Sequence, residues 1–145
     1  MTSSRTNGRT DATKRILVAT DLSDGTDAVV EQAERLAQRF DALIRVVHVV
    51  PSEPVGVEYR EREAEVQKIG DRLWDRQIVA KALLVQGPTV ETILEEAERW
   101  DTDLIVMGVK RDRASSHCVL GAVSDGVIRG APCPVMVVPA GANRG

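Results

Sequence analysis

The residues best suited to chemistry lie between Gly108 and Ser124. The apolar run Leu104–Met107 is typical of a short buried strand, and Gly108 follows it directly. Gly121-Ala122-Val123-Ser124 then stands where an apolar-periodic segment begins. A strand, a glycine-bearing loop and a helix start can bind phosphate, because backbone N–H groups and the helix dipole point at the anion and glycine lets it come close. The spacing therefore predicts an anion-binding loop.

Arg111 stands inside this loop, and with Lys110, Arg113 and His117 it makes the loop basic in a chain of net charge -3. The basic loop favours a nearby anion, and the guanidinium fork of Arg111 is suited to phosphate. Two alternatives stay open. In one, Arg111 fills the site, or is strained if its position needs a positive φ. In the other, the loop is a solvated charge cluster whose glycines serve turns and helix–sheet packing.

Three more candidate residues lie at or just past the ends of predicted strands: Asp21, Val49 and Gly87. Asp21 is either a ligand for a group bound nearby or the cap of a turn or helix. His48, inside an apolar run, is interpreted as a packed, hydrogen-bonded core histidine rather than a catalytic base. Apart from Asp21, no arrangement of a nucleophile with His, or of paired carboxylates, can be assigned near the predicted phosphate site.

Apolar runs predict five strands, at Arg15–Thr20, Ala42–Val50, Ile78–Gln86, Leu104–Met107 and Pro134–Val138. Apolar residues at helical spacing predict four helices between them, over Val29 to Phe40, Tyr59–Arg76, Val90 to Trp100 and Leu120 to Ile128, the last ended by Gly130. This alternation predicts an α/β fold, a three-layer sandwich with a parallel sheet covered on both faces. Ligands of such sheets bind outside the carboxyl ends of the strands, where the candidate residues lie.

Composition limits the class of protein. With 145 residues, 43% hydrophobic and 28% charged, the chain suits one globular domain. Its acidic balance argues against nucleic-acid binding, and no apolar run approaches the roughly 20 residues of a membrane span. Residues 1–13 are polar and lack the apolar middle of a signal peptide, so we expect a disordered leader, a domain over 14–140, a flexible tail over 141–145 and a cytoplasmic location.

Several segments resemble the universal stress protein family. They are Ile-Leu-Val-Ala-Thr-Asp-Leu-Ser at 16–23, Val-His-Val-Val at 47–50, Gly-Pro-Thr at 87–89, Asp-Leu-Ile-Val-Met-Gly at 103–108, Gly-Ala-Val-Ser at 121–124 and Ala-Pro-Cys-Pro-Val-Met-Val-Val-Pro at 131–139. The resemblance covers Lys14 to Pro139. It implies a Rossmann-like, five-stranded parallel sheet of order 3-2-1-4-5, and a homodimer formed through the last strand, Pro134–Val138.

The resemblance also implies an adenine nucleotide, ATP or AMP, at the carboxyl ends of the strands. Asp21 lies where the family has an acidic residue near adenine or an indirectly held Mg²⁺, Val49 where a backbone contacts adenine, and Gly87 beside the ribose. Met107 and Gly108 correspond to residues along the sugar and phosphates, and Gly121, Ala122, Val123 and Ser124 to the phosphate-binding helix start.

The family's ATP-binding motif departs at two positions of this sequence. Its pattern is Gly, two residues, Gly, nine residues, Gly and then Ser or Thr. Gly108 and Gly121 match it, but Arg111 replaces the second glycine and Ala122 replaces the hydroxyl residue. Three functions therefore stay open: a nucleotide-binding regulatory protein in stress response, a dimeric interaction module that has lost the nucleotide and works through an unknown protein partner, and at most a slow ATPase.

Overall fold

The computed structural model describes residues 14–52, 55–111 and 118–140, so the predicted leader and tail lie outside the described residues. The elements alternate along the chain: β1 (Arg15–Ala19), α2 (Thr26–Phe40), β2 (Leu43–Val50), α3 (Val57–Asp75), β3 (Ala80–Gln86), α4 (Thr89–Arg99), β4 (Leu104–Arg111), β5 (Cys118–Val119), α5 (Ala122–Gly130) and β6 (Val135–Pro139).

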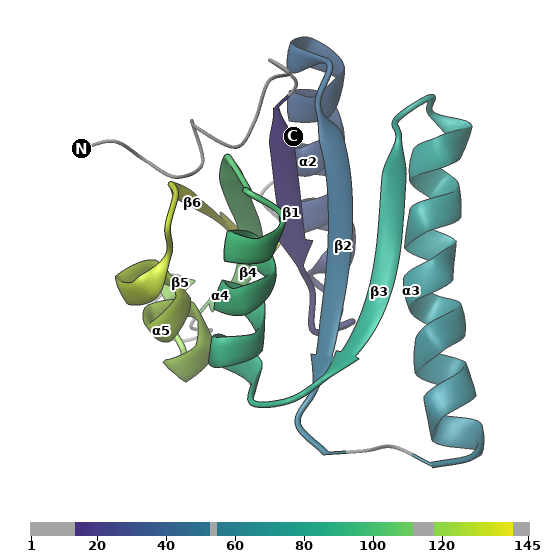
Figure 1. Cartoon of the computed structure of the whole chain (residues 1–145), viewed down its shortest axis with the longest axis vertical. Helices are drawn as coiled ribbons and strands as arrows, with labels where there is room; N and C mark the ends of the chain where they lie inside the picture. Colours follow the sequence, from purple (N-terminus) through teal and green to yellow (C-terminus); the bar gives the residue numbers. More distant parts are fainter. Residues whose placement is uncertain (1–13, 53–54, 112–117, 141–145) are drawn as a thin grey trace.

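Five of these strands form one parallel sheet in the order β3-β2-β1-β4-β6 (Figure 1). In the registers at its centre, Val18 lies opposite Val46 of β2 and Val106 of β4. The predicted α/β fold and strand order are thus confirmed, with β6 as the fifth strand. The short β5 was not predicted; it pairs antiparallel with the end of β4.

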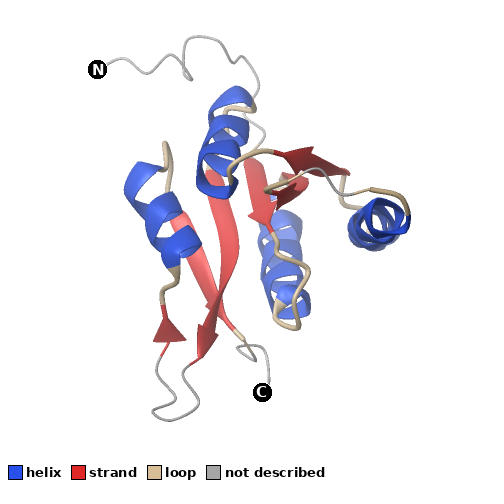
Figure 2. Cartoon of the chain, turned by 90° about the horizontal axis from the view of Figure 1, so that it is seen from below, coloured by secondary structure: helices blue, strands red, loops and turns tan. Residues whose placement is uncertain are grey.

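Helices cover both faces of the sheet, and alternate residues of each strand point to opposite faces. On one face, Val18 and Val46 pack with Val29 and Ala33 of α2 and Leu73 of α3. The second face carries a separate core that includes α4 and α5 and is formed around Leu17, Val47, Ile93, Ile105 and Val127. Figure 2, seen from below, shows the sheet between these two helical layers.

Glycines allow two helices to approach their neighbours closely. Gly70 of α3 lies over Ala82 of β3, where an added Cβ would stand 3.2 Å from the Ala82 methyl group. Gly126 and Gly130 of α5 face α4, where added Cβ atoms would stand 2.9 Å from Val90 and 2.7 Å from Leu94. The helix cost of Gly70, about 1 kcal/mol relative to Ala, is therefore offset by helix–sheet contact.

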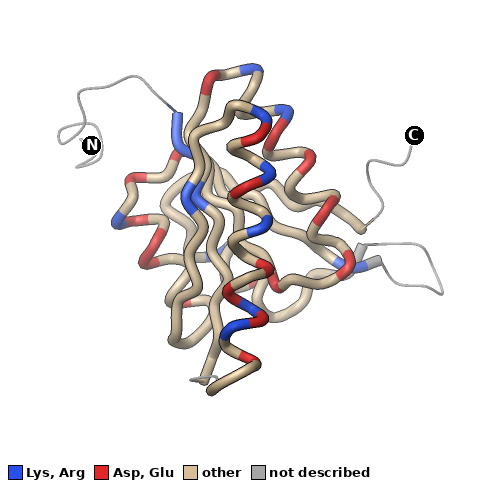
Figure 3. The backbone as a smooth tube through the Cα atoms, turned by 90° about the vertical axis from the view of Figure 1, so that its right-hand side faces the viewer, with Lys and Arg blue, Asp and Glu red and all other residues tan. Residues whose placement is uncertain are grey.

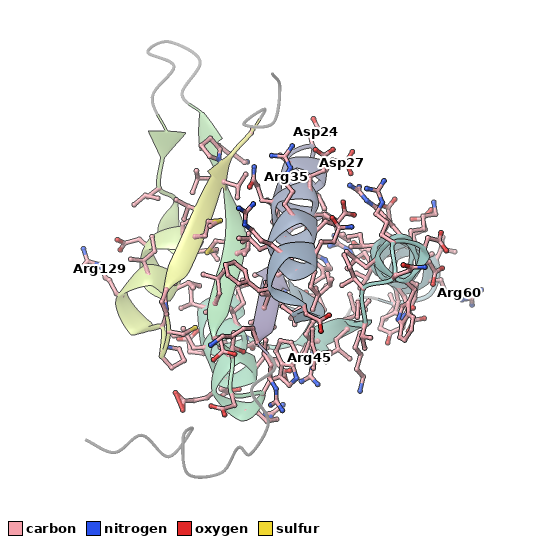
Figure 4. The ribbon with its side chains drawn as sticks, turned by 90° about the horizontal axis from the view of Figure 1, so that it is seen from above. Asp24, Asp27, Arg35, Arg45, Arg60 and Arg129 are labelled. Atoms are coloured by element: carbon pink, nitrogen blue, oxygen red, sulfur yellow. The ribbon has the colours of Figure 1, made fainter. Side chains whose placement is uncertain are left out.

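A buried carboxylate joins the two helices of one layer. Glu34 of α2 is 4% exposed, and its oxygens accept hydrogen bonds from Arg72 Nε at 2.7 Å and Arg76 Nη1 at 3.1 Å, both on α3. Asp27, labelled near the start of α2 in Figure 4, lies 3.5 Å from Arg72 Nη1. Elsewhere α3 carries basic and acidic residues interspersed along its length (Figure 3).

Two predicted apolar faces were partly wrong. Phe40, which ends the apolar-periodic segment predicted as the first helix, is 59% exposed. Trp100, the C-cap of α4, packs against the core of the second face as its apolar spacing predicted, and Arg45 lies over its ring. Of the residues assigned to the inner face of α5, Val127 is buried, but Val123 and Ile128 are 37% and 42% exposed. Because α5 contacts α4 through its glycines, its large side chains are free to face outward.

No helix within the described parts of the chain is both long and apolar enough to cross a membrane.

Candidate functional site

β4 extends beyond the end of β1 at the carboxyl edge of the sheet. Met107 lies opposite Ala19, the last residue of β1, and β4 then continues to Arg111. Lys110 is thereby brought within electrostatic range of Asp21. Partial burial raises the pKa of Asp21, but hydrogen bonds from Ser23 and the charge of Lys110 outweigh it and hold the pKa below its usual value. Asp21 is therefore an ionised carboxylate at this edge.

Asp21 forms a turn rather than the helix cap. Its Oδ1 accepts a hydrogen bond from the Ser23 N–H at 2.9 Å, whereas the N-cap of α2 is Gly25. The intervening Leu22 has φ of 61°, a left-handed conformation that costs a branched side chain about 1–3 kcal/mol. The turn-capping alternative for Asp21 is thus seen in the structure, and the carboxylate keeps acceptor capacity for a ligand.

Thr20 holds this turn through all of its polar groups. Its N–H donates to Val47 O at 3.0 Å, and its hydroxyl accepts from the Leu22 N–H and pairs with Thr26 Oγ1, each at 2.9 Å. Its carbonyl lies 2.9 Å from His48 Nδ1. The turn that presents Asp21 is therefore fixed to β2 on one side and to α2 on the other.

Gly87 ends β3 with a backbone that other residues rarely adopt. Its φ is 151°, and its N–H donates to Val50 O at 3.0 Å. A Cβ at this position would collide with Thr92 Oγ1. Glycine is required here both for its backbone freedom and for the close approach of α4.

The structure corrects the interpretation of Gly108 as part of a loop. Gly108 lies inside β4 and pairs with Val138 of β6. An added Cβ would stand 3.1 Å from Val29 Cγ2, so the absence of a side chain lets α2 pack on β4. The phosphate-loop interpretation placed Gly108 just after the strand and is wrong on this point. The alternative, in which the glycines serve helix–sheet packing, is confirmed for Gly108.

Arg111 is the last residue of β4 and pairs with Cys118 of β5. Its backbone is therefore extended, and the strained, positive-φ alternative does not apply. Arg113 and His117, predicted to share its basic loop, lie outside the described residues.

The helix predicted to start at Gly121–Ser124 is α5, which begins at Ala122. Its N-cap is Gly121, with φ of -81° and ψ of 179°, and no side chain of the described residues caps the helix. Ala122 and Val123 are exposed, whereas Ser124 is 6% exposed. An added Cβ at Gly121 would meet no atom of the described residues within 4 Å. Since the first N–H groups of a helix lack partners within it, this end can donate to an anion.

Val49 and Met107 differ from the other candidates because their side chains are 8% and 5% exposed and belong to the core around Leu17. A ligand at this edge would meet them chiefly through their backbone. Sequence reasoning missed Thr20 as a residue that shapes the site; the signal was its position between the last apolar residue of a strand and an Asp.

The donors for a metal are sparse. In the described ranges, no three His, Cys, Asp or Glu side chains gather as a metal site would require. The carboxylate of Asp21 therefore fits an indirect contact to a cation carried by a ligand, rather than a site that holds a cation alone.

The model of the universal stress protein family matches residues 12–139. The chain belongs to this family. The confirmed strand order and the predicted resemblance agree with that assignment.

Individual universal stress proteins align over most of their length. One from Thermus aquaticus is 37% identical over 134 residues, which cover 86% of this chain and 98% of the relative. The structure of the Archaeoglobus fulgidus protein in complex with dAMP has a TM-score of 0.70 at 23% identity, covering 86% of this chain and 96% of that one. An Arabidopsis thaliana family protein with AMP bound has a TM-score of 0.66 at 19% identity, covering 90% and 94%. These two structures share the fold.

Proposed function

We propose that this universal stress protein binds an adenine nucleotide, ATP or AMP, at the carboxyl edge of its sheet and acts through its bound state as a cytoplasmic regulator in stress response. The observation that carries the proposal is the start of α5 behind Gly121, which no side chain in the described part of the chain caps. Such a helix end attracts phosphate through its N–H groups and dipole. The dAMP and AMP held by the two structural relatives support adenine as the base.

Each candidate residue has a role in this proposal. The adenine lies by the backbone of Val49 and near Asp21, the ribose lies by Gly87, and the sugar and phosphates lie along Met107 and Gly108. The phosphates accept hydrogen bonds from the start of α5, at Gly121, Ala122, Val123 and Ser124, with Arg111 as a further cation. Mg²⁺, where the nucleotide carries it, is held indirectly by Asp21.

The two departures from the family motif set the expected strength of binding. Ala122 offers its N–H but no hydroxyl, and loss of one hydrogen bond to a charged group costs about 1.5–3 kcal/mol. That corresponds to an affinity about 10- to 150-fold weaker. The carboxylate of Asp21 lies within electrostatic range of Lys110 and offsets part of the positive potential that Lys110 gives this edge. We therefore expect weaker binding than the complete motif would give.

The variant Gly121→Asn separates binding from folding. Asn is among the best N-cap residues, and its side-chain oxygen would accept the N–H groups that phosphate needs. The backbone of Gly121 has a negative φ, and the space for a Cβ is open on the described side. We expect the melting temperature to hold or rise while nucleotide affinity falls at least tenfold. Affinity equal to that of the wild type would refute phosphate binding at α5.

The alternative function is a dimeric interaction module without nucleotide. It is favoured by Ala122 and by Gly108, whose missing side chain serves packing against Val29. In the described part of the chain β6 pairs with β4 alone, which leaves one edge for a second copy, and Val137 is 36% exposed. In this reading Val137→Lys converts a dimer to a monomer in sedimentation analysis. Adenine nucleotide released from the purified, denatured protein, detected by absorbance and mass, would refute the nucleotide-free alternative.

A further inference from the structure

We infer that His48 is a positioning residue for the candidate nucleotide site, which it serves by anchoring the turn that presents Asp21. This inference rests on the proposed function. His48 lies in β2 and is 4% exposed. Its Nδ1 lies 2.9 Å from the carbonyl oxygen of Thr20, and that carbonyl belongs to the peptide bond that leads directly into Asp21.

The contacts of His48 fix which ring nitrogen carries the proton. Its Nε2 lies 3.0 Å from Arg62 Nη1 of α3. A guanidinium can only donate hydrogen bonds, so Nε2 accepts. Nδ1 then carries the hydrogen and donates to Thr20 O. The two contacts together therefore define one tautomer of His48, with the hydrogen on Nδ1.

Arg62 comes from a part of α3 that has few other ties to the sheet. Figure 1 shows the lower end of α3 extending beyond the ends of β2 and β3. The first buried residue of this helix is Val66, and the residues before it are exposed or half-buried. Glu58, one turn before Arg62, accepts from its Nη2 at 3.3 Å. The chain Glu58–Arg62–His48–Thr20 therefore joins the overhanging end of α3 to the Asp21 turn.

The anchor acts on a turn that is strained. Leu22 has a positive φ, and such a conformation persists only where its surroundings impose it. The Thr20 hydroxyl holds the Leu22 N–H, and His48 holds the Thr20 carbonyl. Without His48, Thr20 keeps its other contacts, but the Asp21 carboxylate is free to move away from its position within electrostatic range of Lys110.

Two substitutions of His48 separate the two contacts. His48→Asn places an amide N–H near the position of Nδ1, so it keeps the bond to Thr20 O and loses the acceptor for Arg62. His48→Leu loses both. Loss of a neutral hydrogen bond corresponds to about 2- to 13-fold, so we expect ATP or AMP to bind about 5- to 10-fold more weakly to His48→Leu and within about twofold of the wild type to His48→Asn.

A matched control distinguishes loss of the His48 anchor from a general loss of stability. Val46→Ala truncates a fully buried residue on the same face of β2, two residues before His48, and is expected to lower stability without changing nucleotide affinity. If Val46→Ala weakens nucleotide binding as much as His48→Leu, the effect is one of general packing and the inference is wrong.

A nucleotide-free measurement tests the anchor itself. In the ¹⁵N spectrum of the wild-type protein, we expect the Nδ1 of His48 to be of the protonated type and its Nε2 of the unprotonated type, assigned by their loss in His48→Asn. The amide signals of Asp21 and Leu22 should move in His48→Leu and stay in His48→Asn. The opposite tautomer, or unmoved amides in His48→Leu, would overturn the inference. Wild-type protein that binds no nucleotide would instead overturn the proposed function, and the positioning role with it.

Discussion

The sharpest test of the site's architecture is Gly87→Ala. The residue that ends β3 has φ of 151°, and an added methyl group would collide with Thr92 Oγ1 on α4. The backbone strain contributes about 1–3 kcal/mol, and forcing a methyl group into this packed position adds about 1–3 kcal/mol. We therefore expect the free energy of unfolding to fall by about 2–6 kcal/mol, out of a total of about 5–15 kcal/mol for a domain of this kind.

Two companion variants separate the two contributions to the cost of Gly87→Ala. Gly56→Ala measures the cost of backbone strain alone. Gly56 has φ of 61°, and an added Cβ would have no atom of the described residues within 4 Å. Thr92→Ala removes the colliding hydroxyl, so Gly87→Ala should cost about 1–3 kcal/mol less in that background. Urea unfolding of the four proteins and the double variant gives each free energy. The reasoning is refuted if Gly87→Ala costs no more than Gly56→Ala and shows no coupling to Thr92→Ala.

Three further predictions concern binding, charge and pH. Ala122→Ser restores a hydroxyl at the start of α5 and should raise nucleotide affinity by up to about 10- to 150-fold, measured by calorimetric titration. Glu34→Gln removes the charge that Arg72 and Arg76 share and should lower the free energy of unfolding by about 1–2 kcal/mol in urea, since both arginines are partly exposed. Asp21→Asn should lower stability at neutral pH and cause no deficit in strong acid. Because folding lowers the pKa of Asp21, its ionised form stabilises the fold at pH values above the ordinary pKa of 3.8. This contribution is lost as the pH falls through the lower pKa of the folded state. Thermal melts of the wild type and of Asp21→Asn from pH 7 to pH 2 should show the difference in melting temperature disappear in acid. A difference that stays constant with pH would contradict the prediction.

Much of the fold could be predicted from the sequence because its central strands, such as β1 and β2, are buried on both faces. Runs such as Leu43–Val50 are nearly continuous in apolar residues, which is typical of a parallel sheet. The strand order followed from the family resemblance and is confirmed. His48 was correctly interpreted as a packed, hydrogen-bonded core residue.

Two of the misplaced features, Gly108 and the outward face of α5, share one physical cause, because glycine serves both turns and close packing. Gly108 was interpreted as the end of a strand, but it lies within β4 because Val29 of α2 occupies the space of a side chain. Gly126 was not assigned to any face, yet it and Gly130 form the contact of α5 with α4 and turn Ile128 outward. Periodicity of large residues does not reveal a helix face formed by glycines.

The candidate site was predictable as a location but not in its internal contacts. The carboxyl ends of parallel strands meet at one edge, so Asp21 and Gly87 could be assigned to it from the order of elements alone. The hydrogen bonds of Thr20 and the charge of Lys110 beside Asp21 depend on how far β4 extends past β1. The last residues of β4, Lys110 and Arg111, pair with β5, a strand that the sequence did not indicate.

The measurement that tests the account most directly is calorimetric titration of the full chain with ATP and with AMP, each with and without Mg²⁺. It should be run beside Gly121→Asn and Arg111→Gly, with melting temperatures recorded at the same nucleotide concentrations. The account predicts one nucleotide per chain and a rise in melting temperature for the wild type. In Gly121→Asn it predicts an affinity at least tenfold lower and a smaller rise at the same nucleotide concentration. No heat and no shift in melting temperature at millimolar nucleotide would contradict it.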